Sequence, residues 1–148
     1  MFAKMEVQSV SKWLAHHATL TLPEDTVEDD EKIVKTRYTP LGVCGGICPW
    51  NFPLLLSMGK IAPAVLTGNC IIIKPSPFTP YTALKMVELA QEVFPAGVVQ
   101  VIGGDDKLGP MLTAHPDIAK ISFTGSIATG KKIMEACSKT LKRVTLEL

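Results

Sequence analysis

Strand-forming runs alternate with helix-forming segments along most of this chain, from Lys32 to Leu148. Short runs rich in apolar residues predict strands, and longer segments with a 3.6-residue period predict helices. The runs that predict strands are 32–38, 41–48, 69–75, 98–103, 120–125 and 143–148, and those that predict helices are 54–67, 80–93, 106–114 and 126–139. Strands separated by helices in this way form a parallel sheet covered on both faces. We therefore expect an α/β fold: a Rossmann-like open parallel sheet with helices on both faces.

The N-terminal part of the chain does not follow this alternation of strands and helices. Residues 3–17 predict an amphipathic helix, with an apolar face made of Val7, Val10, Trp13 and Leu14. The segment PEDTVEDDEK follows and has six acidic residues between Glu24 and Glu31, which predicts a solvated linker. We expect two parts: an N-terminal helix with an acidic linker over residues 1–31, and a nucleotide-binding domain over residues 32–148.

The net charge and the hydropathy of the chain bear on whether it binds nucleic acid or a membrane. A net charge of +1 gives no electrostatic reason to expect nucleic acid or an anionic membrane. The stretch Leu41–Gly59 has no charged residue and is long enough to cross a membrane. However, Pro49, Pro53 and four glycines interrupt it, and Lys60 follows, so a lipid-exposed helix would leave backbone groups unpaired. We expect a buried strand followed by a buried helix, and no membrane span.

The spacing of the four cysteines is neither of the zinc type nor C-x-x-C: Cys44, Cys48, Cys70 and Cys137. We expect free thiols in a reducing compartment, which favours a cytoplasmic protein. Neighbouring side chains on a helix point apart, so His16 and His17 do not form a metal-binding pair, and His115 is remote from them in sequence. The sequence therefore predicts no metal site.

The segment ISFTGSIATGKK places Gly125 and Gly130 between a predicted strand and a predicted helix. Glycines at a helix N-terminus let backbone N–H groups approach a phosphate, and the helix dipole favours the anion. The segment is close to the P-loop pattern, but Lys132 stands where a hydroxyl should hold magnesium. The turn therefore predicts either a phosphate site or an ordinary strand–helix connection, and it leaves a P-loop-like NTPase as an alternative.

Two further strand ends carry unusual residues, and ligands of open parallel sheets bind at such ends. Lys74 ends an apolar strand, where its ammonium could reach ribose or phosphate oxygens, or could simply lie on the surface. In CPWNFP, Pro49 and Pro53 restrict the backbone around Asn51. A fixed amide there could stabilise an oxyanion. Alternatively, Asn51 lies in a buried turn and bonds to its own backbone.

Together these segments resemble the aldehyde dehydrogenase superfamily. The resemblance is carried by five blocks in order: PLGVCGGICPWNFP, the GK of SMGKIAPAVLTGN, IKPSPFTP, ISFTGSIATG and RVTLEL. It implies an enzyme that oxidises a small-molecule aldehyde to a carboxylic acid with NAD or NADP, through a cysteine thiohemiacetal and a thioester. It also implies a homo-oligomer for the full-length protein.

The resemblance assigns roles to residues of this sequence. Asn51 matches the amide that holds the aldehyde oxygen as it becomes an oxyanion, and Lys60 matches a lysine near the active centre. Matching cofactor-binding positions are Trp50, Lys74, Ser76, Gly125, Ser126 and Gly130. NAD is favoured, but Pro77 stands where many NAD-preferring members have a glutamate, so NADP stays open.

Glu147 resembles the general base of the family, which activates water to hydrolyse the thioester. Without the resemblance, Glu147 would be interpreted as an exposed acidic residue on an edge strand. None of the four cysteines matches the surroundings of the family's nucleophile, which lies further along in a catalytic cysteine domain. We therefore expect a fold that is incomplete relative to the full family, a chain inactive alone and, as an alternative, a non-catalytic dinucleotide-binding or assembly module.

Overall fold

The computed structural model describes residues 2–148, and within them helices and strands alternate as the sequence predicts. The helices are α1 (Phe2–His17), α2 (Pro53–Leu66), α3 (Tyr81–Ala90), α4 (Leu108–Ala114) and α5 (Ile127–Ser138). The strands are β1 (Asp25–Glu28), β2 (Ile33–Thr36), β3 (Val43–Ile47), β4 (Cys70–Lys74), β5 (Val99–Val101), β6 (Ile118–Thr124) and β7 (Arg143–Glu147). The α/β fold class is confirmed.

Five strands form one sheet in the order β5-β4-β3-β6-β7, and every neighbouring pair is parallel. The chain builds the sheet outward from β3 in one direction, and then returns to add β6 and β7 on the other side. Gly45 and Gly46 lie in the central strand β3, where an added Cβ would come within 2.7 Å of Ile121 and 2.6 Å of Ile73, respectively. The side chains of neighbouring strands therefore fill the space above and below β3.

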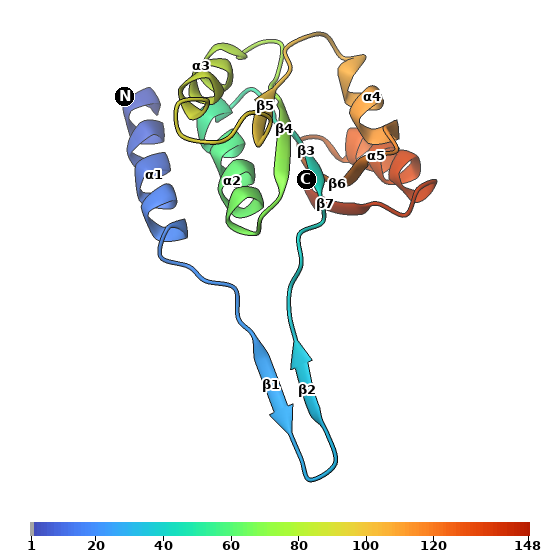
Figure 1. The fold of residues 1–148 in the computed structure, drawn as a ribbon. Coiled ribbons are helices and arrows are strands. Elements are labelled where there is room, and N and C mark those ends of the chain that lie inside the picture. The colour runs from blue at the N-terminus through green and yellow to red at the C-terminus, as the bar shows by residue number, and fades with distance from the viewer. Residues whose placement is uncertain (1) are drawn as a thin grey trace.

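Helices cover both faces of this sheet, with α1, α2 and α3 on one side and α4 and α5 on the other (Figure 1). Each face has its own apolar cluster. The first packs residues of α1, α2 and α3 on the sheet: Val10, Leu54, Met58, Ile61, Ile71, Ile73 and Val87. The second packs residues of α4 and α5 on the opposite face: Leu112, Ile118, Ile121, Phe123, Ile133 and Cys137. Together they account for the alternation of apolar residues in the strands.

The acidic segment is exposed, as predicted, but it contains a strand. β1 pairs antiparallel with β2, and this hairpin projects away from the rest of the molecule (Figure 1). The Asp29 carboxylate closes the turn by accepting the N–H groups of Glu31 and Lys32, each at 2.9 Å. The run 32–38 is therefore not part of the parallel sheet, and the expected boundary after residue 31 falls in the hairpin turn.

Helix α1 is also present, but its inward face differs from the predicted one. Val10 is buried and Leu14 is half-buried, whereas Val7 and Trp13 are 54% and 39% exposed. Glu6 lies one turn before Val10 and is half-buried on the inward face.

Residue 1, which belongs to the expected segment 1–31, lies outside the described residues. Within the part that the structure covers, no helix is both long and apolar enough to cross a membrane.

Candidate active site

Four strands of the sheet bring their carboxyl ends to one edge. In the register of the sheet, Ile47 of β3 pairs with both Lys74 and Phe123, and Thr124 pairs with Glu147. The turn that follows β3, the end of β4, the turn after β6 and the end of β7 therefore share one edge. The structure thus gathers the sequence-predicted segments at the place where parallel sheets bind ligands.

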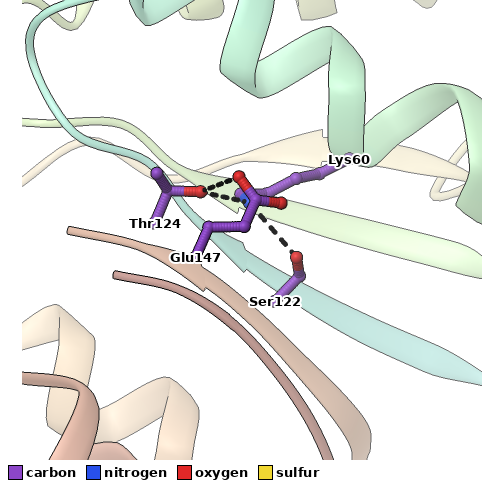
Figure 2. A network of polar contacts seen from close by, with 4 residues as sticks. All are labelled: Lys60, Ser122, Thr124 and Glu147. Atoms are coloured by element: carbon purple, nitrogen blue, oxygen red, sulfur yellow. Dashed lines mark hydrogen bonds and ion pairs between the residues drawn. The ribbon is translucent and has the colours of Figure 1, made fainter. Parts of the chain in front are cut away.

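Lys60 of α2 is the centre of a polar network at this edge (Figure 2). Its side chain is 4% exposed. The ammonium donates hydrogen bonds to Thr124 Oγ1 at 2.8 Å and to Ser122 Oγ at 3.2 Å. Both hydroxyls come from β6, on the side of the sheet that α2 covers. A buried ammonium is stable only with such partners, so these contacts hold Lys60 in a fixed position.

Glu147 joins the same network through Thr124. The Thr124 hydroxyl donates to Glu147 Oε2 at 2.8 Å, and Glu147 Oε1 lies 3.8 Å from the Lys60 ammonium nitrogen. The Glu147 side chain is 54% exposed. β7 is an edge strand, and its Val144 and Leu146 pack into the second apolar cluster. The carboxylate is therefore held by the protein on one side and open to solvent on the other.

Lys74 is not a surface lysine, because the residue is only 6% exposed. No hydrogen bond or ion pair of its ammonium is found within residues 2–148. Among these residues, no fully enclosed side-chain nitrogen or oxygen lacks a partner, so the ammonium reaches the surface. Ser76 is also 6% exposed, and its hydroxyl accepts the N–H of Phe78 at 3.3 Å. Lys74 is therefore a largely buried cation whose ammonium can still bind an outside acceptor.

The tip of the CPWNFP turn, residues 50–52, is exposed rather than buried. Asn51 Oδ1 accepts the N–H of Phe52 at 3.1 Å, so the alternative in which Asn51 bonds to its own backbone is correct for this oxygen. No partner for the Asn51 amide nitrogen is found within the described chain, which leaves its two N–H groups able to donate. Trp50 is 63% exposed, and its carbonyl accepts the Thr79 hydroxyl at 3.3 Å. This bond connects the turns that follow β3 and β4.

The turn from Gly125 to Gly130 has a clear structural role. Ser126 is the N-cap of α5: its hydroxyl accepts the N–H of Thr129 at 3.3 Å. An added Cβ would lie 2.5 Å from the Phe123 ring at Gly125 and 2.7 Å from the Leu148 side chain at Gly130. Packing against the buried Phe123 ring therefore explains Gly125, whereas the exposed Leu148 side chain could move away from a Cβ at Gly130. The first turn of α5 still offers N–H groups to an anion.

Three of the four thiols of this chain have a raised pKa. All four cysteines are free. Burial raises the pKa of the Cys48 thiol, and a hydrogen bond with Ser57 and the charge of Lys60 oppose this rise. Burial also raises the pKa of the Cys44 and Cys137 thiols. The thiolate is the reactive form, so these three thiols are poor nucleophiles near neutral pH. No cluster of three potential metal ligands is found from residue 2 onward.

Sequence reasoning missed Ser122 and Thr124, although both lie in the ISFTG segment. Their signal was available: polar residues alternate with Ile121 and Phe123, which places both hydroxyls on the face opposite the second cluster. Their partner Lys60 is 62 and 64 residues away in sequence, so no local pattern connects them.

Comparisons with known proteins agree with this fold. The sequence model described as the aldehyde dehydrogenase family matches residues 2–148. The aldehyde dehydrogenase LUC3 of a Fusarium species is 57% identical over 98% of this chain and 30% of its own length. The lactaldehyde dehydrogenase structure from Escherichia coli has a TM-score of 0.94 at 36% identity, over 99% of this chain and 32% of its own.

A Mycobacterium tuberculosis aldehyde dehydrogenase, solved in complex with NAD+, has a TM-score of 0.89 at 36% identity, over 97% of this chain and 30% of its own. The chain thus spans about a third of the length of the curated relatives it matches: 30% of LUC3 and 32% of a second relative.

Proposed function

The chain belongs to the aldehyde dehydrogenase family, and on that premise we propose that it supplies the dinucleotide-binding part of an enzyme that oxidises an aldehyde to a carboxylic acid with NAD or NADP. The observation that carries the proposal is the convergence of four strand ends, with Lys74, Gly125 and Glu147 at one edge of a parallel sheet. The division into an N-terminal part over residues 1–31 and a dinucleotide-binding domain over residues 32–148 is part of the same proposal.

The residues at this edge fit a dinucleotide. The Lys74 ammonium supports the proposal best, because its side chain is largely buried while the ammonium reaches the surface and has no protein partner among the described residues. It would donate to ribose or phosphate oxygens. Ser76 and Trp50 would lie beside it, and Gly125, Ser126 and Gly130 would face the phosphates at the start of α5. These residues would hold a dinucleotide whose nicotinamide would supply the hydride acceptor.

Asn51 and Glu147 are proposed to act on the substrate. The free N–H groups of Asn51 would donate to the aldehyde oxygen as negative charge develops on it. The Glu147 carboxylate, which is open to solvent on one side, would take a proton from the water that hydrolyses the acyl intermediate. Lys60 and Thr124 would keep the carboxylate in place. We assign no nucleophile among the four cysteines, since three of them are buried thiols with a raised pKa.

Cofactor preference, assembly and location are further parts of the proposal. NAD is favoured over NADP, although exposed Pro77 puts no carboxylate beside Lys74 that would repel a 2′-phosphate. The hairpin exposes Val27, Ile33 and Val34, which suits association into a homo-oligomer. Four free thiols suit a reducing compartment such as the cytoplasm.

Calorimetric titration of the 148-residue chain with NAD, NADP and Mg-ATP tests the cofactor proposal. We expect either dinucleotide to bind without magnesium. We also expect Lys74→Met to weaken binding by about tenfold, roughly 1–2 kcal/mol, because one hydrogen bond to a charged donor is lost. Lys139→Met removes an exposed lysine of the same charge and should leave the affinity unchanged.

Two outcomes would contradict the proposal. Binding of Mg-ATP far more tightly than either dinucleotide would favour a P-loop-like NTPase. The features that match this alternative are the Gly125–Gly130 spacing and Lys131. Equal dinucleotide affinity of Lys74→Met and wild type would show that Lys74 does not contribute to the binding site.

A further inference from the structure

Glu6 of α1 forms a contact that the proposed function does not use. Its Oε1 accepts the backbone N–H groups of Leu54 and Leu55, each at 2.9 Å. These are N–H groups of the first turn of α2, which have no partner within the helix. Glu6 precedes them by 48 and 49 residues. A carboxylate on one helix therefore caps the start of another.

Helix α2 has no cap of its own. Its N-cap residue Phe52 makes no side-chain capping bond, and Pro53, at the first helical positions, has no N–H. The Phe52 N–H is already bonded to Asn51 Oδ1. The Glu6 carboxylate thus replaces the missing N-cap, and its negative charge lies at the positive end of the α2 dipole.

The start of α2 also determines where the candidate active-site groups lie. Asn51 bonds to the N–H of Phe52, and the carbonyl of Phe52 accepts the N–H of Leu56 in the first turn of α2. Lys60 lies two turns further along the same helix. The orientation of the Asn51 amide is therefore connected through the backbone to the turn that Glu6 caps.

Glu6 is held where this contact requires it. Val10 and Leu14 follow it on the inward face of α1, and Val10 packs in the same apolar cluster as Leu54. Within the described residues, the Glu6 bonds are the only hydrogen bonds that a side chain of α1 makes to a residue outside the helix. We propose that Glu6 is a positioning residue of the active site, which fixes the first turn of α2 and so orients the Asn51 amide. The meaning of this orientation for catalysis rests on the proposed function.

The test compares Glu6→Ala, Glu6→Gln and Glu92→Ala in the whole chain by NMR and amide hydrogen exchange. Glu92 is an exposed glutamate beyond α3, so its replacement changes the charge equally. In Glu6→Ala we expect about tenfold faster exchange at the Leu54 and Leu55 amides and shifted side-chain amide signals of Asn51. Glu6→Gln keeps an acceptor of the same shape and should restore most of the protection. Glu92→Ala should change none of these signals.

A merely structural role of Glu6 would change exchange throughout the chain, including β6 and α5, in proportion to the lost stability. That pattern, or unchanged Leu54, Leu55 and Asn51 signals in Glu6→Ala, would overturn the inference. If Glu6→Ala does not fold, Glu6→Asp provides the test, because its side chain is one methylene shorter and cannot hold both N–H groups in the same geometry. Wild-type exchange at Leu54 and Leu55 in Glu6→Asp would then overturn the inference. Failure of NAD and NADP to bind would contradict the proposed function but would leave these readouts unaffected.

Discussion

At the scale of single residues, Thr124 is the group that connects the two charges of the site. Its one hydroxyl hydrogen is donated to Glu147, so the Thr124 oxygen is free to accept from Lys60. The direction of both bonds is thereby fixed. The buried Lys60 ammonium has hydroxyls as its nearest partners and the carboxylate only at 3.8 Å. This arrangement satisfies the ammonium without closing Glu147 off from solvent.

Replacing Thr124 with Val removes the hydroxyl while keeping the branched shape. We expect a loss of about 1–3 kcal/mol in the free energy of unfolding, because Lys60 loses its shortest hydrogen bond while buried. Urea denaturation measures the loss. Thr124→Ser should be much milder, and Thr145→Val changes an exposed threonine of β7 as the matched control. Equal stability of Thr124→Val and wild type would show that the network does not support Lys60.

At the scale of helices and strands, several connections are held by side chains from distant parts of the chain. Asn69 shows this most clearly. It is 6% exposed, and its Oδ1 accepts the N–H groups of Leu41 and Gly42, which lead into β3. Its amide nitrogen donates to Thr67 Oγ1 at 2.7 Å, at the end of α2. One side chain therefore connects the segment before the central strand with the turn between α2 and β4.

Asn69→Ala should lower the free energy of unfolding by about 2–3 kcal/mol, because it leaves backbone N–H groups near Leu41 without acceptors in a partly buried place. Asn51→Ala makes the same chemical change at an exposed turn and should cost less than about 0.5 kcal/mol. Thermal and urea denaturation of both variants provide the comparison. Similar losses for the two would mean that the Asn69 contacts add nothing beyond a surface amide.

The elements that sequence could predict are those specified by local patterns. The apolar runs of β3, β4, β6 and β7 and the periodic segments of α2 and α5 carry their own signal, and all are present. The β1–β2 hairpin was missed because the six acids indicate solvation, whereas the Asp29 turn depends on backbone geometry. The inward face of α1 was missed because Glu6 finds its partner 48 residues away. Periodicity contains no information about such contacts.

At the scale of the whole molecule, the sheet separates two apolar clusters, and buried thiols occur in both. Cys44 and Cys48 lie in the first and Cys137 in the second, and burial raises the pKa of each above its ordinary value of 9.0. Protons therefore leave these thiols in the unfolded chain at a lower pH than in the folded one. Stability from this source is complete below pH 9.0 and decreases as the pH rises from there toward the higher pKa of the folded state.

Cys48→Ala should reduce the alkaline loss of stability. We expect the free energy of unfolding of wild type to fall more steeply above pH 9.0 than that of the variant, by at most about 1.4 kcal/mol per pH unit for one thiol. Urea denaturation at a series of pH values gives both curves, and their difference cancels the titration of lysines and tyrosines. Parallel curves would mean that Cys48 ionises equally in both states.

The strand order has a kinetic consequence for a chain synthesised from its N-terminus. All members of the first apolar cluster lie between Val10 and Val101, so α1 to β5 can collapse as a unit soon after β5 has been made. The second cluster needs Ile47, which is made early, together with residues from Leu112 onward. During that interval the edge of β3 that later pairs with β6 has no partner, and an unpaired edge with apolar neighbours is a template for wrong association. Folding intermediates of this chain should therefore aggregate through β3, and a chaperone that shields this edge should release it when Ile118–Thr124 has left the ribosome.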